Sequence, residues 1–303
     1  MKKATVCIVG GLGNQLHCYA FGRAVAAQNE AILEVDAESG YWNDPYKRQY
    51  LLDAFPLVSI NRKKMPKNRI AQLMFKAKIR LGIALSNKCP LSLRPIVCEG
   101  YPQRYQEDVH RTKYKSNPYF LGCWATYRYY QDIAGELRDE LLPPKPDDPL
   151  ALRILDKIES VRSCSIHWRS YSEEVGVSHP SLTEYYRSAM EIMENKYPDV
   201  RFFVFSDDQS AAKEELDSLG GNVIFADIPA AKGNAQSLID FYLMYSCDHA
   251  IIGDSTFSWW AAWLSDSEAK NIVAPRGLSP WGDDWIPPHW TTVNIEPENG
   301  GGV

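Results

Sequence analysis

The chain has 303 residues, of which 45% are apolar and 23% are charged, and its net charge is −5 at pH 7. This length suits two domains, and the composition is typical of a soluble globular protein. The negative charge argues against nucleic acid as the main partner, and no apolar run is long enough to span a bilayer. The seven cysteines are scattered and form no C-x-x-C pair, which indicates reduced thiols in a cytoplasmic protein.

The first residues, MKKATVCIVGGLGNQLHCYAFGRAVAAQ, predict a strand, a glycine turn and a helix from about Gln15. Gly11 and Gly13 lie in the turn, and Asp36 ends a second strand-like run where the ribose-binding acid of a dinucleotide site would fall. The G-x-G-x-x-G pattern needs a third glycine, and Leu16 stands in its place. A nicotinamide-dependent oxidoreductase is one interpretation of this turn, and an ordinary βα turn is another.

Residues 61–88 are strongly basic, with nine Lys and Arg and no Asp or Glu. Apolar residues recur in this segment at helical spacing: Ile70, Leu73, Met74, Ala77, Leu81 and Ala84. One interpretation is a solvated basic helix that packs on its own domain. The other is a helix that lies on an anionic membrane face, which would place the protein peripherally on the inner membrane.

A proline-rich stretch, LLPPKPDDPL at residues 141–150, has no packing pattern and predicts a linker between domains of residues 1–145 and 146–303. The second half alternates between strand and helix signals. The expected strands are 163–169, 201–208, 222–227, 249–255 and 271–276, and the expected helices are 181–197, 209–220, 235–247 and 257–266. This alternation predicts a parallel sheet covered by helices, and the first half begins in the same way. We therefore expect two α/β domains that face each other across a cleft.

Polar groups follow three of the second-half strands, at the edge where open parallel sheets bind ligands. They are His167 and Arg169, then Ser206, Asp207 and Asp208, and then Asp254, Ser255 and Thr256. Each aspartate or serine has an alternative role as a helix cap, and His167 an alternative role as a core histidine. An arginine at the end of a buried strand, in contrast, requires an anionic partner.

This set of groups suits a nucleoside diphosphate. Arg169 offers a planar fork to a phosphate, and Ser255 and Thr256 start a helix whose N–H groups favour an anion. Carboxylates such as Asp207 and Asp208 accept hydrogen bonds from the N1–H and N2–H₂ groups of guanine, which adenine lacks.

The glycine turn then supplies the other half of the donor site. The backbone at Gly11 and Gly13 would lie near the diphosphate, with Asn14 as a hydrogen-bond donor. We therefore interpret this turn as half of a sugar-nucleotide site, in preference to the dinucleotide site and the ordinary βα turn.

Five segments together carry a family resemblance: GGLGNQLHCYAFGRAVA, YFLGCWATYRYYQD, SIHWRS, FFVFSDD and DFYLMYSCDHAIIGDSTFSWWAAWL. The chain resembles family 11 glycosyltransferases, the bacterial α-1,2-fucosyltransferases. The resemblance implies a GT-B-type fold with two Rossmann-like domains, GDP-β-L-fucose as donor, inversion at the anomeric carbon, and no metal or other cofactor. It assigns the donor to His167, Arg169, Asp207, Asp208, Ser255 and Thr256, and the acceptor to a galactoside of an oligosaccharide or a lipid-linked polysaccharide repeat unit.

Three positions depart from the family pattern. Ser170 stands where the family has a second arginine, Ser172 where it has an acid, and Asp254 where it has an asparagine. These departures leave the acceptor open, and they also leave open another donor sugar.

The expected reaction is an in-line displacement in which Arg169 and the helix start at Ser255 neutralise the leaving diphosphate. If a general base acts, Glu173 or Glu174 is the candidate. An acceptor-stacking wall is one interpretation of four aromatic residues, and core packing is the other: Trp124, Tyr127, Tyr129 and Tyr130. A non-catalytic binder of sugar nucleotides is the remaining alternative to the transferase and the oxidoreductase.

Overall fold

The computed structural model describes residues 1–56, 60–169, 182–217, 220, 222–228, 233–277 and 282–295. The chain divides into two compact units, and the division falls between Leu142 and Pro143. The turn η7 (Gly282–Trp285) groups with the first unit, where Thr126 Oγ1 donates to the Asp284 carbonyl over 2.6 Å. The expected boundary at 145/146 lies three residues from this division. The return of η7 to the first unit was not predicted.

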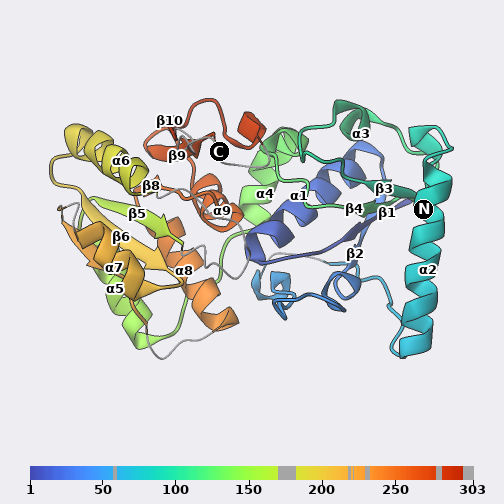
Figure 1. Ribbon diagram of the computed structural model, residues 1–303, viewed down its shortest axis with the longest axis horizontal. Coiled ribbons are helices and arrows are strands. Elements are labelled where there is room, and N and C mark those ends of the chain that lie inside the picture. Colours follow the sequence, from blue (N-terminus) through green and yellow to red (C-terminus); the bar gives the residue numbers. More distant parts are fainter. Residues whose placement is uncertain are drawn as a thin grey trace, which may run out of the picture. The chain divides into compact units, whose positions relative to one another are not determined.

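The first unit is built on a four-stranded parallel sheet (Figure 1). Its order is β2 (Ile32–Asp36), β1 (Lys3–Cys7), β4 (Tyr119–Leu121) and β3 (Ile96–Cys98). The helices of this unit are α1 (Leu12–Gln28), α2 (Arg69–Ser86), α3 (Glu107–Arg111) and α4 (Ala134–Glu140).

Helices α1 and α2 cover opposite faces of this sheet. Successive side chains of β1 point to opposite faces, so neighbouring residues of this strand contact different helices. Val6 faces α1, and a Cβ on Gly22 would lie 2.9 Å from Val6 Cγ1. Cys7 belongs instead to the core cluster against which α2 packs. On that side a Cβ on Gly82 would lie 2.6 Å from Ile96 Cγ1. Both helices therefore approach the sheet closely at a glycine.

The residues of α2 that pack on the sheet are not those that the helical spacing indicated. Phe75, Ile79 and Ile83 pack against the cluster of Cys7, Ile96 and Tyr119. The six apolar positions singled out in the sequence are exposed or half-exposed on other sides of the helix, and all four of the large residues among them are more than half exposed: Ile70, Leu73, Met74 and Leu81. Helix α2 therefore packs on its own domain, as the first interpretation predicted, but it does so through a different face from the one that the helical spacing indicated.

The second unit is built on a six-stranded parallel sheet. Its order is β10 (Thr291–Asn294), β9 (Ile272–Arg276), β8 (His249–Ile251), β5 (Ser163–Trp168), β6 (Arg201–Ser206) and β7 (Val223–Phe225). The helices of this unit are α5 (Pro149–Glu159), α6 (Thr183–Lys196), α7 (Gln209–Asp217), α8 (Asn234–Ser246) and α9 (Thr256–Leu264). The expected alternation of strands and helices is confirmed.

Both faces of the six-stranded sheet are covered. Ile166 and Val204 share a core cluster with residues of α6 and α7. His167, which follows Ile166 and so lies on the other face, contacts Phe257 of α9 with ring centroids 5.6 Å apart. Helices α5 and α9 both pack against α8. This double covering explains why the strands read as continuous apolar runs.

The aromatic cluster of the first unit is core rather than an acceptor wall. Trp124, Tyr129 and Tyr130 are at most 1% exposed. Trp124 stacks on Phe21 with ring centroids 4.1 Å apart, and Tyr130 bonds to His17 over 2.9 Å. Three of the four residues proposed for an acceptor wall are therefore unavailable to a ligand, and that interpretation is wrong for them.

Candidate functional site

The candidate site of the second unit is the carboxyl edge of its sheet, where β8, β5 and β6 are consecutive neighbours. In the pairing of β5 with β6, Trp168 lies opposite Ser206, and these are the last residues of the two strands. Arg169 and Asp207 are therefore the first residues after the strands. On its other side β5 pairs with β8, which leads into the start of α9. The topology thus brings together the three strand ends that the sequence singled out.

His167 is buried near the end of β5, with its ring beside Phe257. The Tyr186 hydroxyl donates to its carbonyl over 2.9 Å, and a Cβ on Gly253 would lie 3.0 Å from that same oxygen. Burial lowers the pKa of His167 to about 3, so the imidazole is neutral at physiological pH. Its buried Nδ1 has no hydrogen-bond partner among the described residues.

Arg169 lies one residue past β5, and its side chain is 47% exposed. The sequence predicts an arginine at the inner end of a buried strand, and this prediction is wrong because Arg169 lies past the strand and is half-exposed. Its anionic partner is Asp207, whose Oδ2 lies 3.6 Å from Arg169 Nε. An ion pair at this distance and exposure is weak, so it leaves the guanidinium available to a second anion.

Helix α9 begins at this edge and is buried on all sides, because TFSWWAAWL is apolar around its whole circumference. Trp259 and Trp263 stack within it, with ring centroids 5.7 Å apart. Ser255 is its N-cap, with Oγ accepting from the Phe257 N–H over 3.3 Å. The capping alternative for Ser255 is therefore confirmed. A serine that accepts in this way still has its own O–H to donate to a ligand.

The other acid of the FSDD segment is also a helix cap. Asp208 Oδ1 accepts from the Ala211 N–H at the start of α7 over 3.0 Å. Ser206 Oγ accepts from the Asp208 N–H over 2.9 Å, which fixes the turn between β6 and α7. The capping alternative for Asp208 is confirmed, and capping engages only one of its two carboxylate oxygens.

In the first unit, the glycine turn leads from β1 into α1, which starts three residues earlier than expected. Gly10, with φ of 75°, is the residue that needs to be glycine, since its Cβ would lie 2.6 Å from Asn14 Nδ2. Gly11 is the N-cap and has no side chain to cap the helix. A Cβ there would meet open space. Gly13 is buried in the first turn.

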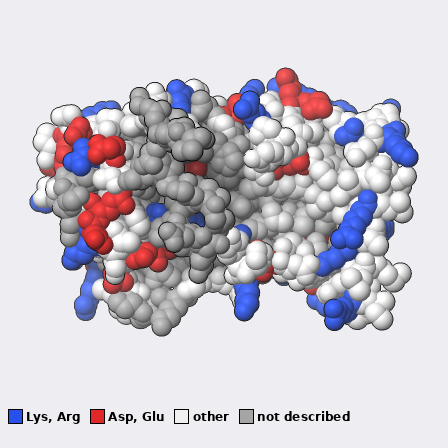
Figure 2. Space-filling view, viewed as in Figure 1, with Lys and Arg blue, Asp and Glu red and all other residues white. Residues whose placement is uncertain are grey.

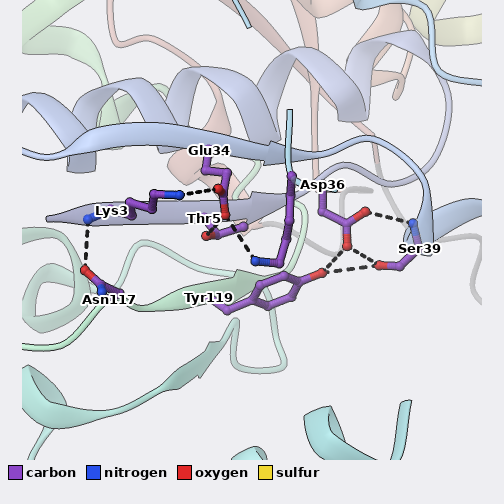
Figure 3. Close-up of polar contacts among 8 residues, drawn as sticks. Lys3, Thr5, Glu34, Asp36, Ser39, Asn117 and Tyr119 are labelled. Atoms are coloured by element: carbon purple, nitrogen blue, oxygen red, sulfur yellow. Dashed lines mark hydrogen bonds and ion pairs between the residues drawn. The ribbon is translucent and has the colours of Figure 1, made fainter. Parts of the chain in front are cut away.

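Asp36 is fully buried at the end of β2 and is saturated with hydrogen bonds (Figure 3). Its Oδ1 accepts from the backbone of Glu38 and Ser39 over 3.0 and 2.8 Å. Its Oδ2 accepts from the hydroxyls of Ser39 and Tyr119, each over 2.5 Å. The carboxylate has no accepting capacity left for a ribose, which removes the acid on which the nicotinamide interpretation depended.

Two acids near the same edge of the second unit were missed in the sequence. Asp227 follows β7, and its position at the end of a predicted strand is the feature of the sequence that could have identified it. Asp240 on α8 accepts from Gln236 Nε2 over 2.6 Å. Burial, and to a smaller extent the nearby charge of Asp227, together raise the pKa of Asp240 to about 7.

Several predicted residues lie outside the described part of the chain: Ser170, Ser172, Glu173 and Glu174. Within the described residues, no cluster of three or more His, Cys, Asp and Glu side chains has the arrangement of a metal site. The general base and the metal-free reaction therefore stay predictions.

The family model of Glycosyl transferase family 11 matches residues 4–280. An α-1,2-colitosyltransferase of Escherichia coli is 28% identical over 282 residues, which cover 90% of this chain and 90% of that one. The O-antigen biosynthesis glycosyltransferase WbnK of Escherichia coli is 27% identical and covers 89% of this chain and 93% of its own. Human galactoside α-(1,2)-fucosyltransferase 1 is 32% identical over 128 residues, 37% of this chain and 32% of its own.

Two solved structures have a similar fold. The fucosyltransferase NodZ from Bradyrhizobium aligns with a TM-score of 0.50 at 16% identity, covering 86% of this chain and 92% of its own. An Arabidopsis thaliana FUT1 mutant in complex with GDP aligns with a TM-score of 0.52 at 13% identity, covering 89% and 70%. The expected α/β fold of the GT-B type is confirmed.

Proposed function

The chain belongs to glycosyl transferase family 11, and from this premise we propose that it moves L-fucose from GDP-β-L-fucose to a galactoside hydroxyl with inversion, forming an α-1,2 linkage. The observation that carries the proposal is the family match over residues 4–280, which includes every candidate site residue. The named relatives that transfer colitose or fucose through α-1,2 linkages support the linkage.

We assign the diphosphate of the donor to the carboxyl edge of the second unit. Arg169 offers a half-exposed guanidinium group, whose Nε lies 3.6 Å from its present partner, Asp207 Oδ2. Ser255 offers a hydroxyl at the start of α9. Neutral His167 would serve binding, since an imidazole with a pKa of about 3 is not protonated to imidazolium at neutral pH and so is not a general acid. Gly11, Gly13 and Asn14 stay a prediction for the same donor.

In the reaction we propose, an acceptor hydroxyl oxygen bonds to C1 of the sugar while the bond from C1 to the β-phosphate oxygen breaks. The bonding pair leaves with GDP, and the hydroxyl proton passes to a base or to water. Glu173 and Glu174 stay the candidates for that base. Charge that develops on the leaving phosphate is stabilised by Arg169 and by the dipole of α9, which are in place before the reaction begins.

A second donor sugar has a specific observation in its favour. The α-1,2-colitosyltransferase matches along 90% of both chains, and Ser170, Ser172 and Asp254 depart from the pattern that the fucosyltransferase resemblance implied. We therefore propose colitose as the alternative sugar, carried on the same nucleotide.

The experiment is a GDP-release assay with GDP-fucose or GDP-colitose and a panel of β-galactosides, with and without EDTA. We expect acceptor-dependent release from one of the two donors, and the same rate in EDTA. Binding of the donor without release over time would indicate a non-catalytic protein. Loss of activity in EDTA, restored by Mg²⁺ or Mn²⁺, would contradict the metal-free reaction.

A further inference from the structure

Helix α2 has two apolar faces, and among the residues that the structure describes only one of these faces packs against the rest of the chain. The inner face, formed by Phe75, Ile79 and Ile83, packs against the sheet of the first unit. Gly82 allows that contact to be close, because any Cβ there would lie 2.6 Å from Ile96 Cγ1. The inner face is therefore fixed, and the helix cannot rotate to bury the other one without losing this packing.

The opposite face is an outer stripe of large apolar side chains. We define the outer stripe by these residues and their exposed fractions: Ile70 74%, Leu73 58%, Met74 68%, Leu81 61% and Leu85 49%. With 3.6 residues per turn they lie along one side of the helix, together with the exposed Ala77 and Ala84. Single exposed apolar residues are ordinary, but a contiguous stripe of this kind marks a binding surface.

The surroundings of the outer stripe are positive. Residues 61–88 contain nine Lys and Arg and no acid. Lys63 and Lys67 pair with acids of the same unit, Glu34 and Glu38, over 3.1 and 3.2 Å. Lys76 Nζ lies 5.7 Å from the centroid of the Trp42 ring. The other cations of the helix and its end have no ion-pair partner among the described residues: Arg69, Lys78, Arg80 and Lys88. Figure 2 shows blue Lys and Arg side chains separated by white surface in the part of this unit that carries α2.

Lys78 and Arg80 flank the outer stripe on its two sides. Each residue advances about 100° around an α-helix, so these two positions lie on opposite shoulders of the line through Ile70 and Leu81. Cations beside an apolar stripe are the pattern of a helix that lies in the interface of an anionic membrane. The apolar side chains enter the boundary between headgroups and acyl chains, and the long cationic side chains reach the headgroups.

We propose that the outer stripe of α2 docks this protein on an anionic lipid surface. The charge decides between this surface and a second copy of the chain, because pairing two such helices would set cations against cations with no acid between residues 61 and 88. Among the described helices, none is both long and apolar enough to cross a bilayer. Helix α2 would therefore lie on the surface, and the proposal does not depend on which sugar the enzyme transfers.

The test is sedimentation of the full chain with vesicles of phosphatidylglycerol and phosphatidylcholine, compared with phosphatidylcholine alone. The apolar variant is Leu73→Ser with Met74→Ser, and the charge variant is Lys78→Glu with Arg80→Glu. The matched controls lie on exposed positions of the second unit, Ile192→Ser on α6 and Lys157→Glu on α5. Lys63 and Lys67 are unsuitable for charge reversal, because a new acid there would face Glu34 or Glu38.

We expect binding to the anionic vesicles only, weakened by salt because charges in water are screened beyond about 10 Å at 0.1 M. The apolar and charge variants should each lower the partition coefficient at least about tenfold, since each cation near an anionic surface contributes about a fivefold factor. The controls should stay within about twofold. All variants should keep the circular dichroism spectrum and the GDP-release rate on a soluble acceptor.

Three results would overturn the proposal. One is the absence of wild-type binding to anionic vesicles at low salt. Another is a wild-type dimer in sedimentation velocity that Leu73→Ser with Met74→Ser dissociates, which would assign the outer stripe to a second copy. The third is an equal loss of vesicle binding in the control variants, which would show that α2 is not the docking surface.

Discussion

Both units place acids at the carboxyl ends of parallel strands, but the two edges use these acids differently. In the first unit, Asp36 is fully buried and accepts four hydrogen bonds, and Glu99 accepts from the backbone of Cys123 and Trp124 over 2.7 and 2.9 Å. In the second unit, the side chains of Asp207 and Arg169 are 51% and 47% exposed and lie 3.6 Å apart.

The difference shows that a polar residue at a strand end is not by itself evidence of a binding site. A buried carboxylate must have its hydrogen bonds made within the protein, and one that has done so stabilises the fold. A half-exposed pair with a long contact can exchange its partner for a ligand at little cost. The first edge is therefore structural, and the second is the candidate site.

The largest expected effect is on turnover, at Arg169. If its guanidinium neutralises the leaving diphosphate, Arg169→Ala should lower kcat by about 10²–10³-fold. Arg169→Lys should also be poor, because a point charge does not replace the two-pronged fork. Steady-state GDP release at saturating donor measures both.

The control for Arg169 is at the other end of the same strand. Arg162 precedes β5 and pairs with Asp199 over 3.2 Å, at the amino edge where sheets of this kind do not bind ligands. Arg162→Ala should leave kcat within about twofold. Equal losses in the two variants would remove Arg169 from the mechanism.

The next effect is on stability, at Asp36. Asp36→Ala would leave two backbone N–H groups and two hydroxyls without their acceptor, and each such loss in a buried place costs about 1–3 kcal/mol. We expect the free energy of unfolding to fall by about 2–4 kcal/mol in urea melts followed by circular dichroism. Asp207→Ala should change it by less than about 1 kcal/mol, since its ion pair is exposed. A reversed order of these two values would break the comparison between the edges.

A smaller effect is on nucleotide affinity, at Asp207. Because Asp207 pairs with Arg169, we expect it to act mainly by orienting the arginine toward a diphosphate, which GDP and ADP share. We therefore expect Asp207→Asn to weaken both nucleotides about 2- to 5-fold in calorimetry. A loss confined to GDP would instead assign Asp207 to guanine recognition, the role that the sequence suggested.

The smallest effect is on the pH dependence of stability, at Asp240. Its pKa is about 7 in the folded protein against an ordinary value of 3.8, so the folded state alone keeps the proton between these two pH values. Stability therefore falls as pH rises through this window, and the loss is complete above pH 7. Asp240→Asn should remove this slope and raise the thermal midpoint at pH 8 by about 2–4 °C.

Asp156→Asn, an exposed carboxylate on α5, is the control for Asp240 and should leave the slope unchanged. Identical slopes in wild type and Asp240→Asn would show that the Asp240 carboxyl does not hold its proton in the folded state.

The second-unit fold was largely predictable because its strands and helices alternate with clear apolar periods. Two elements were not. Helix α5 begins inside the proline-rich stretch, where Pro149 is its first residue and Asp148 its N-cap, accepting from Leu150 and Ala151. Proline at the first position of a helix is favourable, so the same residue that indicated a linker also starts a helix. Strand β10 is short and half-exposed, and its apolar pattern is weak.

The neighbouring strand ends of the candidate site were predictable from the sequence, but the partners of their side chains were not. Tyr119, which satisfies Asp36, lies 83 residues away in the chain, so no local pattern distinguishes Asp36 from Asp207. Helix α2 presents the same difficulty, since its sequence carries two apolar faces and only tertiary packing selects the inner one. Local periodicity gives the elements, whereas burial and partners depend on contacts between distant segments.

The most direct test of the central claim is hydrogen–deuterium exchange of the backbone with and without saturating GDP. We expect GDP to slow exchange in the first turn of α9 from Thr256 and in the segments that begin at Arg169 and Asp207. The amides of Glu38 and Ser39, which already donate to Asp36, should exchange at an unchanged rate. Protection at Glu38 and Ser39 with none at α9 would contradict the account, because it would place the nucleotide at the carboxyl edge of the first-unit sheet, to which we assign a structural role.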